Sequence, residues 1–305
     1  MFAYLSAAFF SVLSNCVCVF FVKNGFIILK EKQLILDVFL VNNVINVIFF
    51  TILFYTQKIQ KKINFKITDI FKEKKEIIQF FLFIFPVIAA VFKTYMLDFI
   101  PVTTITISSL IVPYVVWLLA VFLLKEPFRK TYIVCSFLGV CGFMFVNVQK
   151  LSNGGISFGF VDYLLLYILL ESIGQIVLRF YCRKRKHGMQ AVFAEILIYF
   201  IYGGIFLIAR GTFSLSLFFN PYVWLISFFC FLRHVLLING VRKASSVVAL
   251  EFCAFAKPIF ASIIMFVLVG EIPTVIKTIG FFIIAISIVR FHGLERRYKK
   301  IKTYI

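Results

Sequence analysis

The sequence predicts an all-α polytopic membrane protein, with ten transmembrane helices arranged as two inverted five-helix repeats. Three observations lead to this prediction. Hydrophobic residues make up 62% of the 305 residues and the mean hydropathy is +1.03, whereas soluble domains are about 45–50% apolar. The apolar residues are grouped in segments of about 20, the length that crosses a bilayer as a helix. Finally, two parts of the chain resemble each other at a constant offset.

Ten apolar segments are long enough to be transmembrane helices. They cover approximately residues 2–22, 33–56, 76–97, 101–124, 131–148, 160–181, 191–209, 222–241, 244–269 and 273–290. The first lacks a preceding basic region and a small-residue cleavage site, so we expect a retained helix and not a signal peptide. The chain therefore divides into a first five-helix repeat over 1–150, a second over 151–290, and a basic cytoplasmic tail over 291–305.

The Lys and Arg residues between these segments are distributed unevenly. If the N-terminus is cytoplasmic, 22 of them fall on the cytoplasmic side and five on the other. This asymmetry predicts an inner-membrane protein with both termini in the cytoplasm. The net charge of +19 thus reflects membrane topology and gives no reason to expect a nucleic-acid partner. The seven cysteines and three histidines show no metal-ligand spacing, so no metal, cofactor or catalytic residue is predicted.

Charged residues inside the apolar segments are the candidates for function, because a charge at the bilayer centre is costly and usually faces a cavity or a partner. Tyr167, Glu171 and Gln175 are spaced four apart and form one stripe on a helix. Arg233 lies mid-segment with His234 beside it. The remaining candidates for substrate binding are Lys93, Tyr95, Glu251, Lys257, Tyr114, Trp117 and Asn15.

These residue types suit a zwitterionic, amino-acid-like solute. Arg233 or Lys257 would hold a carboxylate, and Glu171 or Glu251 would hold an amine, a sulfonium or a coupling proton. The four aromatic candidates, Tyr95, Tyr114, Trp117 and Tyr167, could stack on a ring or a cation. The alternatives are that Glu171 and Arg233 pair only to fix helix packing, and that Lys93 extends outward to the membrane surface.

Other polar residues have simpler expectations. Asn42, Asn43 and Asn46 lie close together on one segment and should hydrogen-bond between helices. Arg179 is expected to anchor its helix at the membrane surface. Pro113 and Pro258 lie within segments, where a proline removes a backbone hydrogen bond and kinks a helix. Such kinks could act as gating points.

The two similar parts of the chain run from Tyr95 to Glu126 and from Gly240 to Glu271. The alignment places Pro113 against Pro258 and Glu126 against Glu271, in each case 145 residues apart. Because a unit of five helices is odd, the second copy enters the membrane in the opposite orientation. Inverted repeats around a site at the membrane midplane are common in secondary transporters.

The pattern of proline, aliphatic run and glutamate resembles the EamA-type repeat of the drug/metabolite transporter superfamily. Within it, residues 101–126 (PVTTITISSLIVPYVVWLLAVFLLKE) look most like the bacterial S-adenosylmethionine uptake carriers. The resemblance implies ten helices in a five-plus-five inverted arrangement, a central substrate cavity and a small-molecule substrate.

We therefore expect a transporter, secondary active or facilitative, that moves a small metabolite such as S-adenosylmethionine by alternating access. No nucleotide-binding motif is present. The alternatives are an exporter of amino acids or drugs in the same superfamily, a membrane-embedded lipid-modifying enzyme, and a non-transporting assembly subunit. The absence of a His and carboxylate cluster disfavours the enzyme. The partners expected are a solute and the lipid bilayer, and homodimerisation is left open.

Overall fold

The structure is a computed structural model of the whole chain. The residues that it describes are 2–29, 35–60, 77, 81–82, 84–96, 111–123, 125, 133–135, 137–142, 144–145, 161–184, 188–211, 215–243, 256–270 and 274–303. Within these ranges the chain is helical almost throughout and has no β-strand. The labelled helices are α1 (Phe2–Lys23), α2 (Ile35–Ile59), α4 (Ile84–Met96), α6 (Val112–Leu123), α8 (Val161–Lys184), α9 (Gly188–Arg210), α10 (Leu215–Phe218), α11 (Pro221–Lys243), α13 (Lys257–Val269) and α14 (Val275–Thr303).

The all-α membrane class is confirmed. Among the described residues, four helices are long and apolar enough to cross a membrane: Leu5–Val22, Asp37–Ile59, Asp162–Phe180 and Pro221–Arg242. Shorter apolar helices occur in α4, α6, α9 and α13, and at Ile133–Gly142. The total of ten spans stays a prediction. The lysine-rich 57–75 loop and the expected span at 244–269 fall partly outside the described residues.

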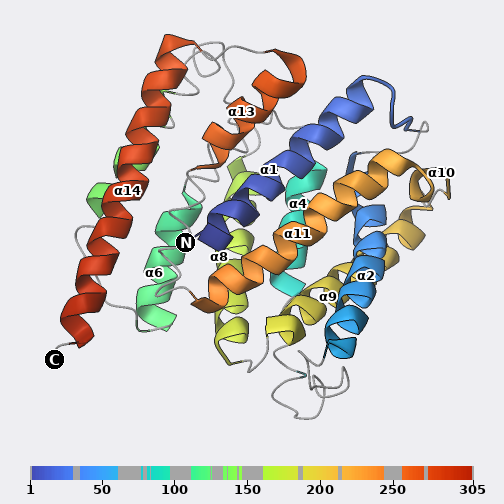
Figure 1. The fold of residues 1–305 in the computed structure, drawn as a ribbon, viewed down its shortest axis with the longest axis horizontal. Helices are drawn as coiled ribbons and strands as arrows, with labels where there is room; N and C mark the ends of the chain where they lie inside the picture. Colours follow the sequence, from blue (N-terminus) through green and yellow to red (C-terminus); the bar gives the residue numbers. More distant parts are fainter. Residues whose placement is uncertain are drawn as a thin grey trace.

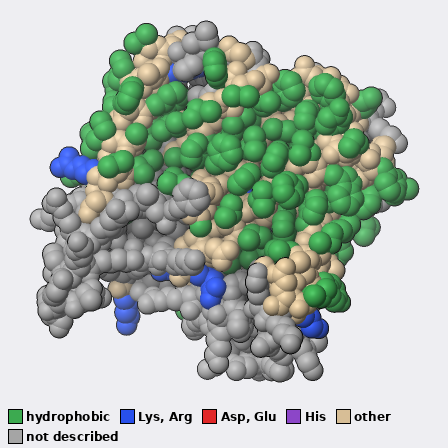
Figure 2. All heavy atoms as spheres, in the orientation of Figure 1, with side chains coloured by type: hydrophobic (Ala, Val, Ile, Leu, Met, Phe, Trp, Pro, Cys, Tyr) green, Lys and Arg blue, Asp and Glu red, His purple; other side chains and the backbone are tan. Residues whose placement is uncertain are grey.

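The outer surface of the bundle is apolar. Large hydrophobic side chains such as Phe122, Ile208 and Val289 are more than 70% exposed on their helices. Figure 2 shows hydrophobic side chains over most of the described part of one face, with Lys and Arg mainly near its margins. Water would penalise such a surface, whereas lipid tolerates it because the helices satisfy their own backbone hydrogen bonds.

Helices from the two expected repeats pack across one another in matching pairs. Helix α1 of the first expected repeat packs along α11 and contacts α13, which both belong to the second. Helix α8 of the second expected repeat packs along α4 and contacts α6, which both belong to the first. Helices α2 and α9 pack against each other. Figure 1 shows α1 and α11 lying side by side across the middle of the bundle, with α14 at one edge. Most helix contacts therefore join the two halves.

At this edge, α14 packs against the helical stretch around Ile133–Gly142. The hydroxyl of Ser287 donates a 2.6 Å hydrogen bond to the carbonyl of Cys135. A Cβ on Gly142 would lie 2.8 Å from the Gly280 carbonyl oxygen, so only glycine permits this approach. Helix α14 ends at Thr303 and therefore includes residues 291–303 of the expected tail.

Two helices begin at positions equivalent in the sequence repeat. Helix α6 begins at Val112 and α13 begins at Lys257, 145 residues further on. Pro113 and Pro258 thus occupy the first turn of a described helix, where a proline interrupts no hydrogen bond of that helix. Ile111 and Ala256 directly precede these starts, and residues 101–110 and 244–255 before them lie outside the described ranges, so the expected mid-helix kink stays a prediction.

Candidate functional site

A cavity of about 190 Å³ lies among α1, α2, α4, α8, α9, α11 and α13. It is smaller than the 300–1,000 Å³ typical of sites for drug-sized ligands. Its lining includes many polar side chains: Ser11, Ser14, Asn15, Asn42, Asn43, Lys93, Glu171, Gln175, Glu195, Tyr199, Arg233, His234 and Lys257. Both expected halves contribute, so the cavity lies at the junction between them.

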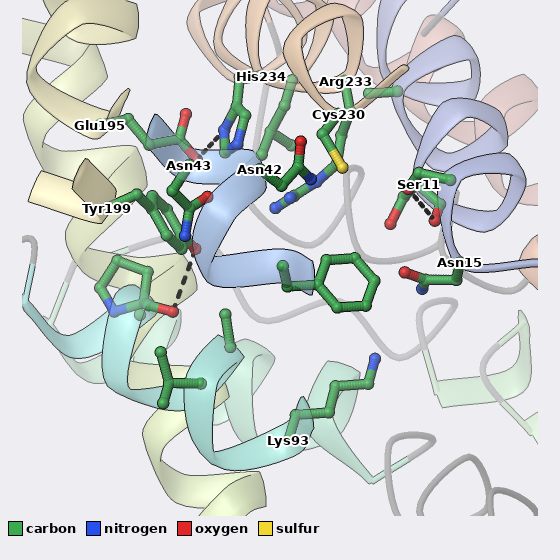
Figure 3. Close-up of a pocket in the computed structure, with 18 of the residues that line it drawn as sticks. Ser11, Asn15, Asn42, Asn43, Lys93, Glu195, Tyr199, Cys230, Arg233 and His234 are labelled. Atoms are coloured by element: carbon green, nitrogen blue, oxygen red, sulfur yellow. Dashed lines mark hydrogen bonds and ion pairs between the residues drawn. The ribbon is translucent and has the colours of Figure 1, made fainter. Parts of the chain in front are cut away.

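Six of the eleven predicted binding residues line this cavity. They are Asn15, Lys93, Glu171, Gln175, Arg233 and Lys257, which come from five different helices. In Figure 3 the side chains of Lys93 and Arg233 extend into the cavity from opposite sides, and Asn15 approaches from α1. Lys93 does not extend outward to the membrane surface, which was the alternative considered from the sequence.

The predicted stripe on α8 is present. Gln175 Nε2 donates a 3.2 Å hydrogen bond to Glu171 Oε1, one helical turn earlier. Gly174 between them lies against α4, and a Cβ there would be 2.9 Å from the Cα of Pro86. This close approach brings the α8 carboxylate to the same cavity as Lys93 of α4.

Tyr167 completes the stripe but is 1% exposed and does not line the cavity. The ammonium of Lys93 lies over its ring, 6.0 Å from the centroid. A cation at this distance from the face of an aromatic ring is attracted to it. Tyr167 therefore holds Lys93 and is not positioned to stack on a ligand.

The other aromatic candidates also lie outside the cavity. Tyr95 is 43% exposed near the end of α4, because two residues after Lys93 the helix has turned by about 200°. Trp117 packs beside the hydrophobic cluster of Cys135, Ile284 and Phe291. Tyr114 is half-buried on α6 and is not part of the lining. Of the remaining candidates, Glu251 lies outside the described residues.

The sequence reasoning did not identify Glu195. Its Oε1 lies 3.0 Å from Nδ1 of His234, and these side chains are 3% and 2% exposed. The ring of Tyr199, one turn after Glu195, lies 5.3 Å from the His234 ring, and its hydroxyl donates to the Pro86 carbonyl at 3.3 Å. The sequence feature that could have identified it is that Glu195 is the one carboxylate in the 191–209 segment.

Several buried polar atoms have no partner among the described residues. Glu195 Oε2 and Asn42 Oδ1 belong to residues that line the cavity, while both side-chain polar atoms of Asn46 lie on the same helix face as Asn42. The expected interhelical hydrogen bonds of Asn46 are thus not seen within the described ranges. Buried polar atoms generally bind water or a ligand when no protein group is near.

Arg179 differs from its expectation as a surface anchor. It is 5% exposed, and its Nη1 donates to the carbonyl of Val241 in the last turn of α11. Carbonyls in a last turn have no partner within their own helix, so Arg179 ties α8 to the end of α11. In the described part of the chain, no group of three His, Cys, Asp or Glu residues could hold a metal ion.

No protein-family model matches the chain, and no curated protein matches it. A solved structure described only as "Crystal structure of protein" superposes with a TM-score of 0.69 over 96% of this chain and 97% of its own length. The two are 13% identical. The chain thus shares its whole fold with at least one known protein, and the similarity carries no information about its activity.

Proposed function

We propose that the protein is a carrier that moves a small charged metabolite across the inner membrane by alternating access. The observation that carries this proposal is the cavity, in which Lys93, Glu171, Arg233 and Lys257 from four helices face a common space. Charges inside a membrane protein are expensive and usually mark a solute or ion pathway. A purely structural ion pair would not need four helices to enclose a space between them.

The packing of the helices supports alternating access. The pairs α1–α11 and α1–α13 have counterparts in α8–α4 and α8–α6, as expected if two inverted five-helix repeats surround one site. Exchanging the conformations of two such halves opens the site first to one side and then to the other. The matched starts of α6 and α13 beside Pro113 and Pro258 would be the points where the two halves bend.

The resemblance to EamA-type carriers gives the first solute to test, S-adenosylmethionine. In the cavity Arg233 or Lys257 would bind its carboxylate, and Glu171 would bind its amine or sulfonium. The positive charges between the apolar segments favour cytoplasmic termini. Uptake into the cell and export would use the same site.

The test is uptake of labelled S-adenosylmethionine and of labelled amino acids by cells that express the chain. Glu171→Gln and Arg233→Ala should each reduce uptake of the transported solute at least tenfold at equal expression. Asp162→Asn, at the exposed start of α8, is the matched control and should transport normally. Transport unaffected by both cavity substitutions would rule out this site.

A further inference from the structure

We propose that the cavity selects solutes with a net negative charge, recognised through oxyanion groups such as carboxylate or phosphate. This inference rests on the proposed transport function and adds the substrate class. Its basis is an imbalance among the ionisable side chains that the described residues contribute to the lining. Lys93, Arg233 and Lys257 supply three cationic groups, whereas Glu171 and Glu195 supply two carboxylates.

The sign of this imbalance does not depend on where the proton of the Glu195–His234 pair lies. With a neutral imidazole the pair carries one negative charge, and with a protonated imidazole it carries none. In the first case the described lining carries one net positive charge and in the second it carries two. In Figure 3 the Glu195 carboxylate is directed at His234, at the opposite end of the drawn site from Asn15. Among the described residues, the carboxylate left to face the three cations is Glu171.

The three cations also act on one another. Lys93 interacts electrostatically with Lys257, Arg233 and Glu171 together, so their charges share one region of the cavity. Like charges gathered away from water repel strongly, and the repulsion falls when an anion enters. A solute with one more negative than positive group would supply the missing counter-charge.

A cavity with this selectivity distinguishes solutes of similar shape by their net charge. Acidic amino acids and small phosphate esters are compact and anionic, so they match both the charge and the volume of about 190 Å³. S-adenosylmethionine carries a carboxylate, an ammonium and a sulfonium, and its net charge is positive. The cavity should therefore prefer an acidic amino-acid-like solute over the carrier substrate suggested by the resemblance.

The experiment measures thermal stabilisation of the purified protein by matched solutes at constant ionic strength, because a ligand that binds the folded state raises the unfolding temperature. The pairs are glutamate with glutamine, aspartate with asparagine, and glycerol 3-phosphate with glycerol. S-adenosylmethionine is the cationic probe. We expect each acid to bind at least about tenfold more tightly than its neutral counterpart. The amino-acid pairs test recognition of a carboxylate, and the glycerol 3-phosphate pair tests recognition of a phosphate.

Variants link the preference to the cavity. Lys257→Gln and Lys93→Gln should each remove most of the tenfold preference, whereas Lys257→Arg should keep it and show that the site is still folded. Lys58→Gln, at the exposed end of α2, should bind like the unmodified protein. Tighter or equal binding of the neutral solutes or of S-adenosylmethionine would overturn the inference while leaving the carrier function intact. If no solute stabilises the protein and none is taken up, the carrier function itself fails, and the inference fails with it.

Discussion

The imidazole Nδ1 of His234 lies 3.0 Å from the carboxylate Oε1 of Glu195, and both side chains are almost fully buried at the wall of the cavity. This contact joins α9 to α11 at the wall of a polar cavity in an apolar bundle. Because the imidazole contacts Glu195, it helps to fix where this carboxylate lies relative to a solute in the cavity.

Breaking this pair should destabilise the fold. Glu195→Ala leaves His234 without its partner, and the expected loss is about 1–3 kcal/mol in the free energy of unfolding. The double variant Glu195→Ala with His234→Ala should lose less than the sum of the two single variants, because neighbouring groups are coupled. Denaturant unfolding in detergent measures each value. Strict additivity would show that the two side chains do not interact.

Gly174 should tolerate no side chain. A Cβ there would lie 2.9 Å from the Cα of Pro86, so Gly174→Ala must push α8 and α4 apart at an expected cost of about 1–3 kcal/mol. The matched control is Gly204→Ala on α9, where a Cβ would meet nothing within 4 Å. This control should be neutral or slightly stabilising, since alanine favours helix. Thermal unfolding of the two variants gives the comparison, and equal stability of both would contradict the packing of α8 on α4.

The proposed topology can be tested by labelling introduced cysteines in intact cells. Asn24 lies just after α1 and Lys58 lies at the end of α2, and both are exposed. In a background without the native cysteines, Asn24→Cys should react with a membrane-impermeant maleimide added outside the cells. Lys58→Cys should react only after the membrane is permeabilised. The reverse pattern would place both termini outside the cytoplasm.

The two equivalent prolines should affect movement more than binding. Pro113→Ala and Pro258→Ala leave the lining of the cavity unchanged but remove the fixed φ of proline and add a backbone N–H at the second residue of α6 or α13. We expect each variant to transport several-fold more slowly while its solute-induced thermal stabilisation stays close to normal. Initial uptake rates and binding are measured on the same preparations. Unchanged rates in both variants would remove the prolines from the gating mechanism.

The sequence by itself predicted that lipid surrounds this protein, and it identified several of the residues that line the cavity. Hydropathy is a local property, so segment lengths and composition predicted α1, α2, α8 and α11 within a few residues of their observed bounds. The cost of a buried charge is equally local, and it selected Lys93, Glu171, Arg233 and Lys257 before any fold was known. The four-residue spacing of Glu171 and Gln175 likewise predicted their shared helix face.

The tertiary structure decided which helix faces meet. The direction in which Tyr95 points depends on how α4 is rotated against its neighbours, and no local pattern sets that rotation. The pairing of Glu195 with His234 and the contact of Arg179 with Val241 each join residues on different helices. Such contacts depend on helix crossings, which arise from packing of the whole bundle. For this reason the charges and a cavity shared by them could be predicted from the sequence, whereas the Glu195–His234 pair at the wall of that cavity could not.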